Sequence, residues 1–262
     1  MKKVIYTGNF SSNWGYFHGV QPWHIRSMYH QLAYAEKHGA DYKVIDNSNE
    51  RMQSIYSLYR EISGGVADSW TLATLVTYAA IQEFSNSEYD QMCWIDIDLF
   101  IKKPDIDLFS YYDPGHLCLY HYYADSRYGD GLSQRFFSNF VGVEHKKYVQ
   151  AGFIILDRQA AYDILNALNH LKIKVENKEY AKTLWSYYHE LRDTKMARDM
   201  PVKFMCDECL LSACISTGKI KLQFPHDDLY SYITNGQNYD RSKDCFSVHF
   251  TAGGKYLINE LF

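Results

Sequence analysis

Apolar residues near the start of the chain switch between strand-like runs and helical spacing. Lys3–Thr7 reads KVIYT, a β-branched run closed by a Gly-Asn pair, which predicts a strand followed by a loop. Pro22 then opens a segment with apolar residues at helical spacing, and Gly39 lies just past its expected end. Tyr42–Asp46 (YKVID) predicts the next strand. This strand, helix, strand order indicates a parallel sheet covered by helices.

The rest of the chain continues the same alternation without an obvious linker. We expect helices around 54–62, 70–84, 159–168, 179–192 and 208–216, and strands over 117–123, 152–157, 220–224 and 246–250. A chain of 262 residues can form one large domain with a substantial core. The pattern therefore predicts a single α/β domain over residues 1–262, with a Rossmann-like, mostly parallel central sheet flanked by helices.

Composition and charge narrow the class of protein. The chain is 47% hydrophobic and 22% charged with five prolines, which is typical of a globular protein and excludes a disordered or collagen-like one. A net charge of −4 without a Lys/Arg block predicts that nucleic acid is not a partner. We find no 18-residue apolar span and no signal-peptide pattern at the start, so we expect a soluble, cytoplasmic protein without an integral membrane segment.

The stretch CWIDIDLFIKKP (Cys93–Pro104) places Asp96 and Asp98 in an apolar run. If the run is a strand, the two carboxylates lie on one face, where their repulsion is costly. We place them at the C-terminal end of a central strand, the edge at which open α/β sheets bind ligands. Three interpretations stay open: a strand end that reaches water, a site for a divalent cation, or the nucleophile motif of a haloacid-dehalogenase-type phosphatase.

Five segments, in order along the chain, resemble the A-type (GT-A) glycosyltransferases and, within them, family 8, which includes glycogenin and bacterial lipooligosaccharide galactosyltransferases. The segments are YTGN (Tyr6–Asn9), WIDIDLF (Trp94–Phe100), QAGFIILD (Gln150–Asp157), DECLLS (Asp207–Ser212) and VHFTAGGK (Val248–Lys255). The resemblance implies a GT-A fold. It also implies a nucleotide-binding half over about residues 1–104 and an acceptor-side half over about residues 105–262.

The resemblance further implies an enzyme that moves a sugar from a nucleotide diphosphate sugar, most simply a UDP-sugar, to a hydroxyl of a saccharide or glycoconjugate. Its metal ligands would be Asp96, Asp98 and His249, a set in which the imidazole favours Mn²⁺ over Mg²⁺. Asp207 and Glu208 would be catalytic, one of them as general base if the reaction inverts the anomeric centre. The donor would be bound by Thr7, Gly8, Asn9, Asp96, Gln150, Ala151, Gly152, Gly253 and Lys255.

Several positions depart from the family pattern. Gln150 replaces the usual Asn, Ala252 replaces a Gly three residues after His249, and the helix expected over 70–84 lacks the family's Arg. Two other functions remain open, a phosphatase or hydrolase using the Asp pair and a non-catalytic nucleotide-sugar-binding protein. For the acceptor, the sequence offers only two aromatic and polar loops, 120–131 and 225–230.

Overall fold

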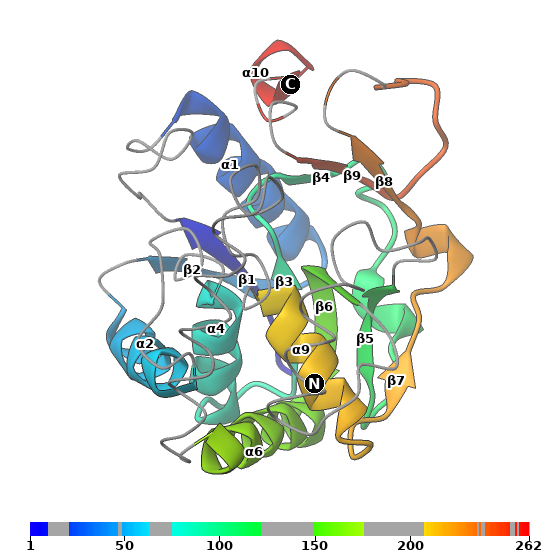
Figure 1. Ribbon diagram of the computed structural model, residues 1–262. Coiled ribbons are helices and arrows are strands. Elements are labelled where there is room, and N and C mark those ends of the chain that lie inside the picture. Colours follow the sequence, from blue (N-terminus) through cyan, green and yellow to red (C-terminus); the bar gives the residue numbers. More distant parts are fainter. Residues whose placement is uncertain are drawn as a thin grey trace, which may run out of the picture.

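The computed structural model describes residues 1–9, 21–46, 49–62, 75–121, 149–175, 207–234, 236, 239–251, 255 and 257–261. Figure 1 shows a central sheet with helices on both sides and a smaller sheet above the end of β3. The first half of the chain contains β1 (Lys3–Asn9), α1 (Pro22–Lys37), β2 (Ala40–Asp46), α2 (Glu50–Ile62), α4 (Val76–Ser85), β3 (Gln91–Ile95), β4 (Leu99–Ile101), the 3-10 turn η2 (Leu108–Tyr111) and β5 (Leu117–His121). The second half contains β6 (Val149–Asp157), α6 (Arg158–Val175), α9 (Asp207–Ser216), β7 (Leu222–Gln223), the 3-10 turn η5 (Asp227–Leu229), β8 (Ser231–Thr234), β9 (Ser247–Phe250) and α10 (Leu257–Leu261).

The predicted strand, helix, strand unit at the start of the chain is confirmed. Pro22 occupies the first turn of α1, where its missing N–H and fixed φ are harmless. Gly39 follows the end of α1 with φ +63°, a left-handed conformation that suits glycine and turns the chain into β2. β1 and β2 then pair in parallel, from Lys3 beside Ala40 onward.

The central sheet has the strand order β2-β1-β3-β6-β5-β7. β1 pairs in parallel with both β2 and β3, and β5 with β7, whereas β6 is antiparallel to β3 and β5. Within the described residues, β6 is therefore the one strand of this sheet that runs against the others. The predicted mostly parallel α/β sheet is confirmed.

A second sheet, of order β4-β9-β8, begins where the sequence predicted one continuous strand. The run around Cys93–Pro104 forms β3 and β4, and Asp96–Asp98 is a turn between them, closed by a hydrogen bond from the Leu99 N–H to the Asp96 carbonyl (2.9 Å). The expectation that Asp96 and Asp98 are neighbours on one face of a strand is therefore wrong. They lie directly past the C-terminal end of β3, because the chain leaves the central sheet at that point to join another.

Other predicted elements shift at their ends. The helices expected at 54–62 and 159–168 begin earlier or run further, at Glu50–Ile62 and Arg158–Val175, and the strand expected at 220–224 shortens to Leu222–Gln223. The helix expected at 179–192 and most of the loop 120–131 lie outside the described residues, as do residues 70–74 of the helix expected at 70–84. β8 and α10 were not predicted, because each is short and lacks a clear apolar period.

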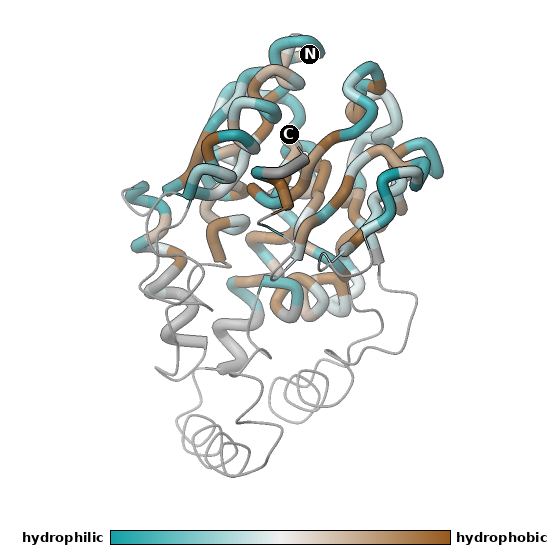
Figure 2. Tube along the Cα trace, turned by 90° about the horizontal axis from the view of Figure 1, so that it is seen from above, coloured by the Kyte–Doolittle hydropathy of each residue, from teal (hydrophilic) through white to brown (hydrophobic). Residues whose placement is uncertain are grey.

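The core fills both faces of the central sheet. Along β1, Val4 and Tyr6 belong to an apolar cluster that includes residues of α4, α6 and α9, whereas Ile5 belongs to a cluster that includes residues of α1. This alternation follows from the two-residue period of a strand, and burial on both faces explains why the strands read as continuous apolar runs. Figure 2 shows the hydrophobic segments gathered inside and hydrophilic ones toward the periphery of the coloured region. Among the helices in the described ranges, none is long and apolar enough to cross a membrane.

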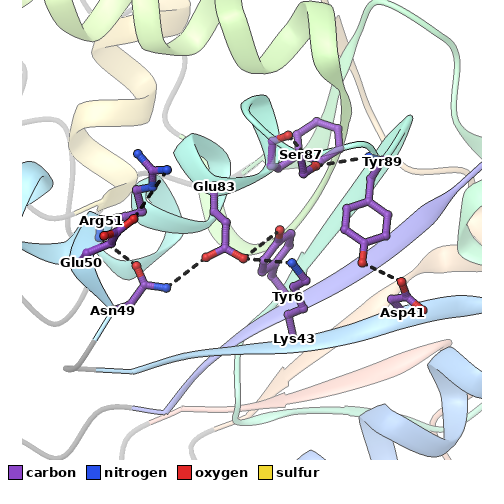
Figure 3. A network of polar contacts seen from close by, with 10 residues as sticks. Tyr6, Asp41, Lys43, Asn49, Glu50, Arg51, Glu83, Ser87 and Tyr89 are labelled. Carbon is purple, nitrogen blue, oxygen red and sulfur yellow. Dashed lines mark hydrogen bonds and ion pairs between the residues drawn. The ribbon is translucent and has the colours of Figure 1, made fainter.

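A polar network fastens β1 and β2 to α4 (Figure 3). The Glu83 carboxylate accepts hydrogen bonds from Tyr6 Oη (3.4 Å) and Asn49 Nδ2 (3.0 Å), and Lys43 Nζ lies 3.2 Å from it. We call Tyr6, Lys43, Asn49 and Glu83 the Glu83 cluster. Because one carboxylate meets a cation and two neutral donors, its charge is balanced and both of its oxygens are hydrogen-bonded within the protein.

Candidate active site

Asp96, Asp98 and His249 converge past the C-terminal end of β3, and we call these three residues the metal group. One ligand atom of each lies within 4.8 Å of the others. His249 Nε2 is 3.1 Å from Asp98 Oδ1 and 3.6 Å from Asp96 Oδ2. The side chains of Asp98 and His249 are buried, whereas that of Asp96 remains 31% exposed. The group is thus open to solvent on the Asp96 side.

Each carboxylate has one oxygen held by a protein donor and the other turned toward His249. Trp94 Nε1 donates to Asp96 Oδ1 at 2.8 Å, and Lys255 Nζ lies 2.7 Å from Asp98 Oδ2. The remaining oxygens, Asp96 Oδ2 and Asp98 Oδ1, are the two nearest to the imidazole. Two carboxylate oxygens and one imidazole nitrogen therefore already lie close together before any ion binds.

The pairing of β4 with β9 brings His249 to the Asp pair. Leu99 faces His249 in this antiparallel register, and the Phe250 N–H donates to the Asp98 carbonyl at 2.9 Å. The turn that ends β3 is thereby clamped to a strand near the C-terminus. Although 151 positions separate His249 from Asp98, their contact is fixed by backbone hydrogen bonds on both sides.

Gly152 is the residue of β6 that gives the imidazole its space. A Cβ at this position would lie 2.7 Å from His249 Cε1 and 3.1 Å from Asp96 Oδ2. The Gly152 carbonyl also accepts from the Asp96 N–H (2.9 Å), so the backbones of β6 and the Asp96 turn are in direct contact. The glycine of the QAGF segment is required here by close approach rather than by a turn.

The charges within the metal group shift its protonation. Burial, reinforced by the charge of Asp98, raises the pKa of Asp96 to about 6. Burial acts in the same direction on Asp98, but the neighbouring Lys255 and His249 outweigh it and hold the Asp98 pKa below its usual range. Burial alone would lower the pKa of His249, yet the two carboxylates raise it. Without a cation, a proton on the imidazole therefore helps to balance the carboxylates.

The second nitrogen of His249 faces Gln150, a residue predicted to contact the donor. Gln150 Nε2 lies 3.4 Å from His249 Nδ1, and both Gln150 and Ala151 are buried in β6. Gln150 thus touches a residue of the metal group directly, in the position of a group that orients the ring.

The three predicted donor contacts from the first strand lie at the end of β1. Thr7 is fully buried and Asn9 is half-buried, and their Oγ1 and Oδ1 atoms have no hydrogen-bond partner in the described part of the chain. Gly8 lies between them, where a Cβ would come within 2.9 Å of Val76 Cγ1 and 3.0 Å of Trp94 Cη2. β1 therefore brings polar atoms to the same sheet edge as the metal group.

Asp207 and Glu208 form the first turn of α9, and both are half-buried. Tyr78, near the start of α4, donates to the Asp207 carbonyl at 2.9 Å, while Val76 in the same turn of α4 lies against Gly8 of β1. The N-terminus of α9 therefore lies at the carboxyl edge of β1. The structure brings both acidic residues to the edge of the sheet that carries the metal group.

Gly253, with its neighbours Ala252 and Gly254, lies outside the described residues, so its predicted contact with phosphate stays a prediction. Lys255 is described, and its side chain is only 15% exposed. Its ammonium contacts Asp98 and lies 5.7 Å from the centroid of the Trp23 ring. The sequence predicted a lysine on the donor diphosphate, and the structure places it on a carboxylate of the metal group.

Sequence reasoning missed Trp94 and Gln31. Trp94 reads as one more apolar strand residue, although its indole N–H holds Asp96. Gln31, buried within α1, donates to the carbonyls of Asp96 and Leu99 (3.0 and 3.1 Å) and so supports the turn between β3 and β4. The apolar spacing of this helix gave no signal for Gln31, because it marks a face on which Ile25 and Tyr29 are exposed, whereas Gln31 lies on the buried side of α1.

The donor atoms of the metal group fit a divalent cation. An ion about 2.1 Å from each ligand separates neighbouring ligand atoms by about 3 Å and opposite ones by about 4.2 Å. The 3.1 and 3.6 Å separations around His249 Nε2 lie in that range. Two carboxylate oxygens with one imidazole nitrogen suit Mn²⁺ or Zn²⁺ better than Ca²⁺, and Mg²⁺ less well than Mn²⁺.

No family model matches the sequence, and a comparison with curated proteins finds no match. Among solved structures, a glycosyltransferase involved in the glycosylation of the major capsid of PBCV-1 matches with a TM-score of 0.50 and 11% identity, over 100% of this chain and 99% of that chain. The chain therefore has the GT-A fold that the sequence resemblance implied. At 11% identity this likeness establishes the fold, and the activity is a separate inference.

Two further structures match more loosely. Mouse xyloside xylosyltransferase 1 matches with a TM-score of 0.49 and 12% identity, over 97% of this chain and 99% of that chain. The galactosyltransferase LgtC, solved in complex with donor and acceptor sugar analogues, matches with a TM-score of 0.46 and 11% identity, over 98% of this chain and 94% of that chain. A likeness at this level does not bear on the reaction of this chain.

Proposed function

We propose that this protein is a metal-dependent glycosyltransferase that uses a nucleoside diphosphate sugar, most simply a UDP-sugar, and a saccharide or glycoconjugate acceptor. The observation that carries the proposal is the pair of carboxylate oxygens facing one imidazole nitrogen at the carboxyl edge of a GT-A sheet. Mn²⁺ is the preferred ion because an imidazole shares the site with two carboxylates. When bound, the ion supplies Lewis-acid stabilisation of the leaving diphosphate.

The residues around the metal group would position the metal ligands and bind the diphosphate. Trp94 and Lys255 hold one oxygen of each carboxylate, which fixes the direction of the other oxygen. Gln150 orients the imidazole, and Gly152 lets the backbone of β6 come close to it. The Lys255 ammonium also adds the positive charge that a diphosphate requires.

Thr7 and Asn9 supply polar atoms for the nucleoside at the end of β1, and Gly8 admits the close packing there. In the reaction, the bond from the anomeric carbon to the diphosphate oxygen breaks and a bond to the acceptor oxygen forms. Asp207 or Glu208 takes the acceptor proton if the reaction inverts the anomeric centre. If it retains, the acceptor attacks from the face that the diphosphate leaves, the departing diphosphate oxygen takes the acceptor proton, and Glu208 lies beside the reacting carbon.

A thermal-shift screen tests the proposal, with uridine, guanosine and thymidine diphosphate sugars in the presence and absence of Mn²⁺. At least one nucleotide sugar is expected to raise the Tm with Mn²⁺, and EDTA or the Asp98→Asn variant should abolish the shift. No shift with any of these ligands would contradict the proposal. Phosphate release from simple phosphomonoesters, without an acceptor, would favour the hydrolase alternative.

A further inference from the structure

The first turn of α1 extends past the Asp96 turn, and a series of contacts fixes its position. Tyr34, in the second half of the helix, donates to the Ile106 carbonyl at 2.7 Å. Gln31, about one turn earlier, donates to the carbonyls of Leu99 and Asp96. The partners thus move from residue 106 back to 96 as the helix is followed toward its N-terminus. Two further turns lead to the start of α1, on the side of the metal group.

His24 lies on this face of α1, and its imidazole contains an unsatisfied donor. The side chain is 1% exposed, and Nδ1 accepts from the Gln21 N–H at 3.4 Å in a capping box. Burial, with the nearby charge of Lys255, lowers the pKa of His24 to about 4, so the ring is neutral. A neutral imidazole that accepts at Nδ1 has its proton on Nε2. In the described part of the chain, that Nε2 is buried without a hydrogen-bond partner.

The surroundings of His24 connect it to the metal group. Its ring packs edge-on against Trp23, with ring centroids 3.9 Å apart. Lys255 Nζ lies 5.7 Å from the Trp23 ring centroid and 2.7 Å from Asp98 Oδ2. Ser27, one turn further along the same face of α1, is fully buried, and its Oγ also lacks a partner among the described residues.

These groups are the donors that an anion with several oxygens would recognise. A buried donor without an acceptor lowers stability, a cost that a purely apolar ring at this position would avoid. The positive end of the α1 dipole and the ammonium of Lys255 favour negative charge at the same place. No carboxylate among the described residues satisfies Nε2, so we expect the missing acceptor to come from a ligand.

We propose that His24 Nε2–H donates to a phosphate oxygen of the nucleoside diphosphate whose other oxygens face the metal group, with Ser27 Oγ as a second neutral donor. The inference rests on the proposed function, and it adds a subsite on α1. A neutral donor suits this place, because it binds a phosphate oxygen without adding a cation beside Lys255.

Calorimetric titrations test the subsite with UDP, uridine and inorganic pyrophosphate, each in the presence of Mn²⁺. His24→Phe keeps a ring but removes the donor, and the Kd for UDP and for pyrophosphate should rise by about tenfold or more. Any measurable Kd for uridine should stay unchanged. His24→Gln should remain within about threefold of the wild-type protein, because a Gln at this position can complete the capping box and donate as well. His38→Phe is the matched control, since its Nε2 contacts the Pro104 carbonyl at the far end of α1.

The inference is overturned if folded His24→Phe binds UDP and pyrophosphate as tightly as the wild-type protein does. If that variant does not fold, the subsite is tested by NMR spectra of the wild-type protein labelled with ¹⁵N-histidine, recorded with Mg²⁺ in place of Mn²⁺. The Nε2–H signal of His24 should shift when pyrophosphate is added, and an unchanged signal contradicts the subsite.

The titrations also separate this inference from the proposed function. Binding of pyrophosphate without binding of any nucleoside diphosphate sugar overturns the proposed function and still tests His24. If the wild-type protein binds nucleotide sugars and His24→Phe binds them equally tightly, only the subsite is overturned. Binding of neither pyrophosphate nor a nucleoside diphosphate overturns both.

Discussion

The Glu83 cluster and the metal group both hold carboxylates inside the protein, but they balance charge differently. In the Glu83 cluster, one carboxylate meets the Lys43 ammonium and two neutral donors (Figure 3). In the metal group, two carboxylates share one imidazole and one ammonium, and one oxygen of each points at the same nitrogen. The first arrangement balances its charge with fixed donors, whereas in the second the two carboxylates raise the pKa of His249.

The difference indicates how to separate a stabilising polar cluster from a binding one. A cluster whose acceptors are all met by fixed donors contributes to folding and offers nothing to a ligand. A cluster whose acceptors converge is held together by protons that a cation can displace. Substitutions in the Glu83 cluster should therefore lower stability more than metal binding, and substitutions in the metal group should lower metal binding more than stability.

The largest effect is expected from Asp98→Asn. The change removes a charge from the metal group and leaves a poorer ligand beside His249, so Mn²⁺ affinity should fall by at least about 100-fold. Titration calorimetry measures the affinity directly. The fold should persist, because the backbone hydrogen bond from Phe250 to the Asp98 carbonyl does not depend on the side chain. Unchanged Mn²⁺ affinity would show that the cation binds elsewhere.

Gly152→Ala should be nearly as damaging to binding. The new methyl would lie 2.7 Å from His249 Cε1, so the imidazole or β6 must move. We expect Mn²⁺ affinity to fall by about 10- to 100-fold, as for other changes that displace a ligand. Gly39→Asn is the control, because the position has open space around it and a left-handed φ that Asn tolerates. Equal Mn²⁺ affinity in the two variants would argue against the His249 ligand.

Binding of Mn²⁺ should strengthen as the pH rises from about 5 to 8. Asp96, with its pKa raised to about 6, and His249, with its pKa also raised, hold protons at the acid end of this window. The cation must displace those protons, so affinity is lost as pH falls and levels off once both groups are deprotonated. Asp98 adds nothing to this dependence, because its pKa is depressed. Calorimetry in buffers with different ionisation enthalpies counts the protons released, and a release of zero at pH 6 contradicts the assignment.

The smallest effect on binding is expected from Glu83→Gln. This change weakens the contact with Lys43, whose side chain is 38% exposed, so the free energy of unfolding should fall by only about 1 kcal/mol. Urea denaturation measures that loss, and Mn²⁺ affinity should stay within about twofold of the wild-type value. A large loss of Mn²⁺ affinity in this variant would erase the distinction between the two clusters.

Elements with a strong apolar period could be predicted from the sequence. β1, β2 and β6 belong to this class, because each is bounded by Gly or polar residues and packs apolar side chains on the core. The extent of α1 was also predicted, but Ile25 and Tyr29 of its apolar period are exposed and its buried side includes Gln31. β4, β8 and β9 are three or four residues long, and their pairing depends on distant partners. The apolar run around Asp96 therefore could not show that the chain leaves the central sheet at that residue.

The candidate site was predictable only in part. The resemblance to family 8 placed His249 and Lys255 near the Asp pair, but the sequence could not show which atoms meet. The contact of Lys255 with Asp98 and the support from Trp94 depend on side-chain packing, which no local pattern encodes. The unsatisfied nitrogen of His24 exists only because the folded protein buries it.

The metal site can be located by anomalous diffraction from crystals grown with Mn²⁺ and UDP. We expect a manganese peak about 2.1–2.3 Å from Asp96 Oδ2, Asp98 Oδ1 and His249 Nε2, adjacent to diphosphate density. A peak at another place, or no peak while His249 stays hydrogen-bonded to Asp98, would contradict this expectation.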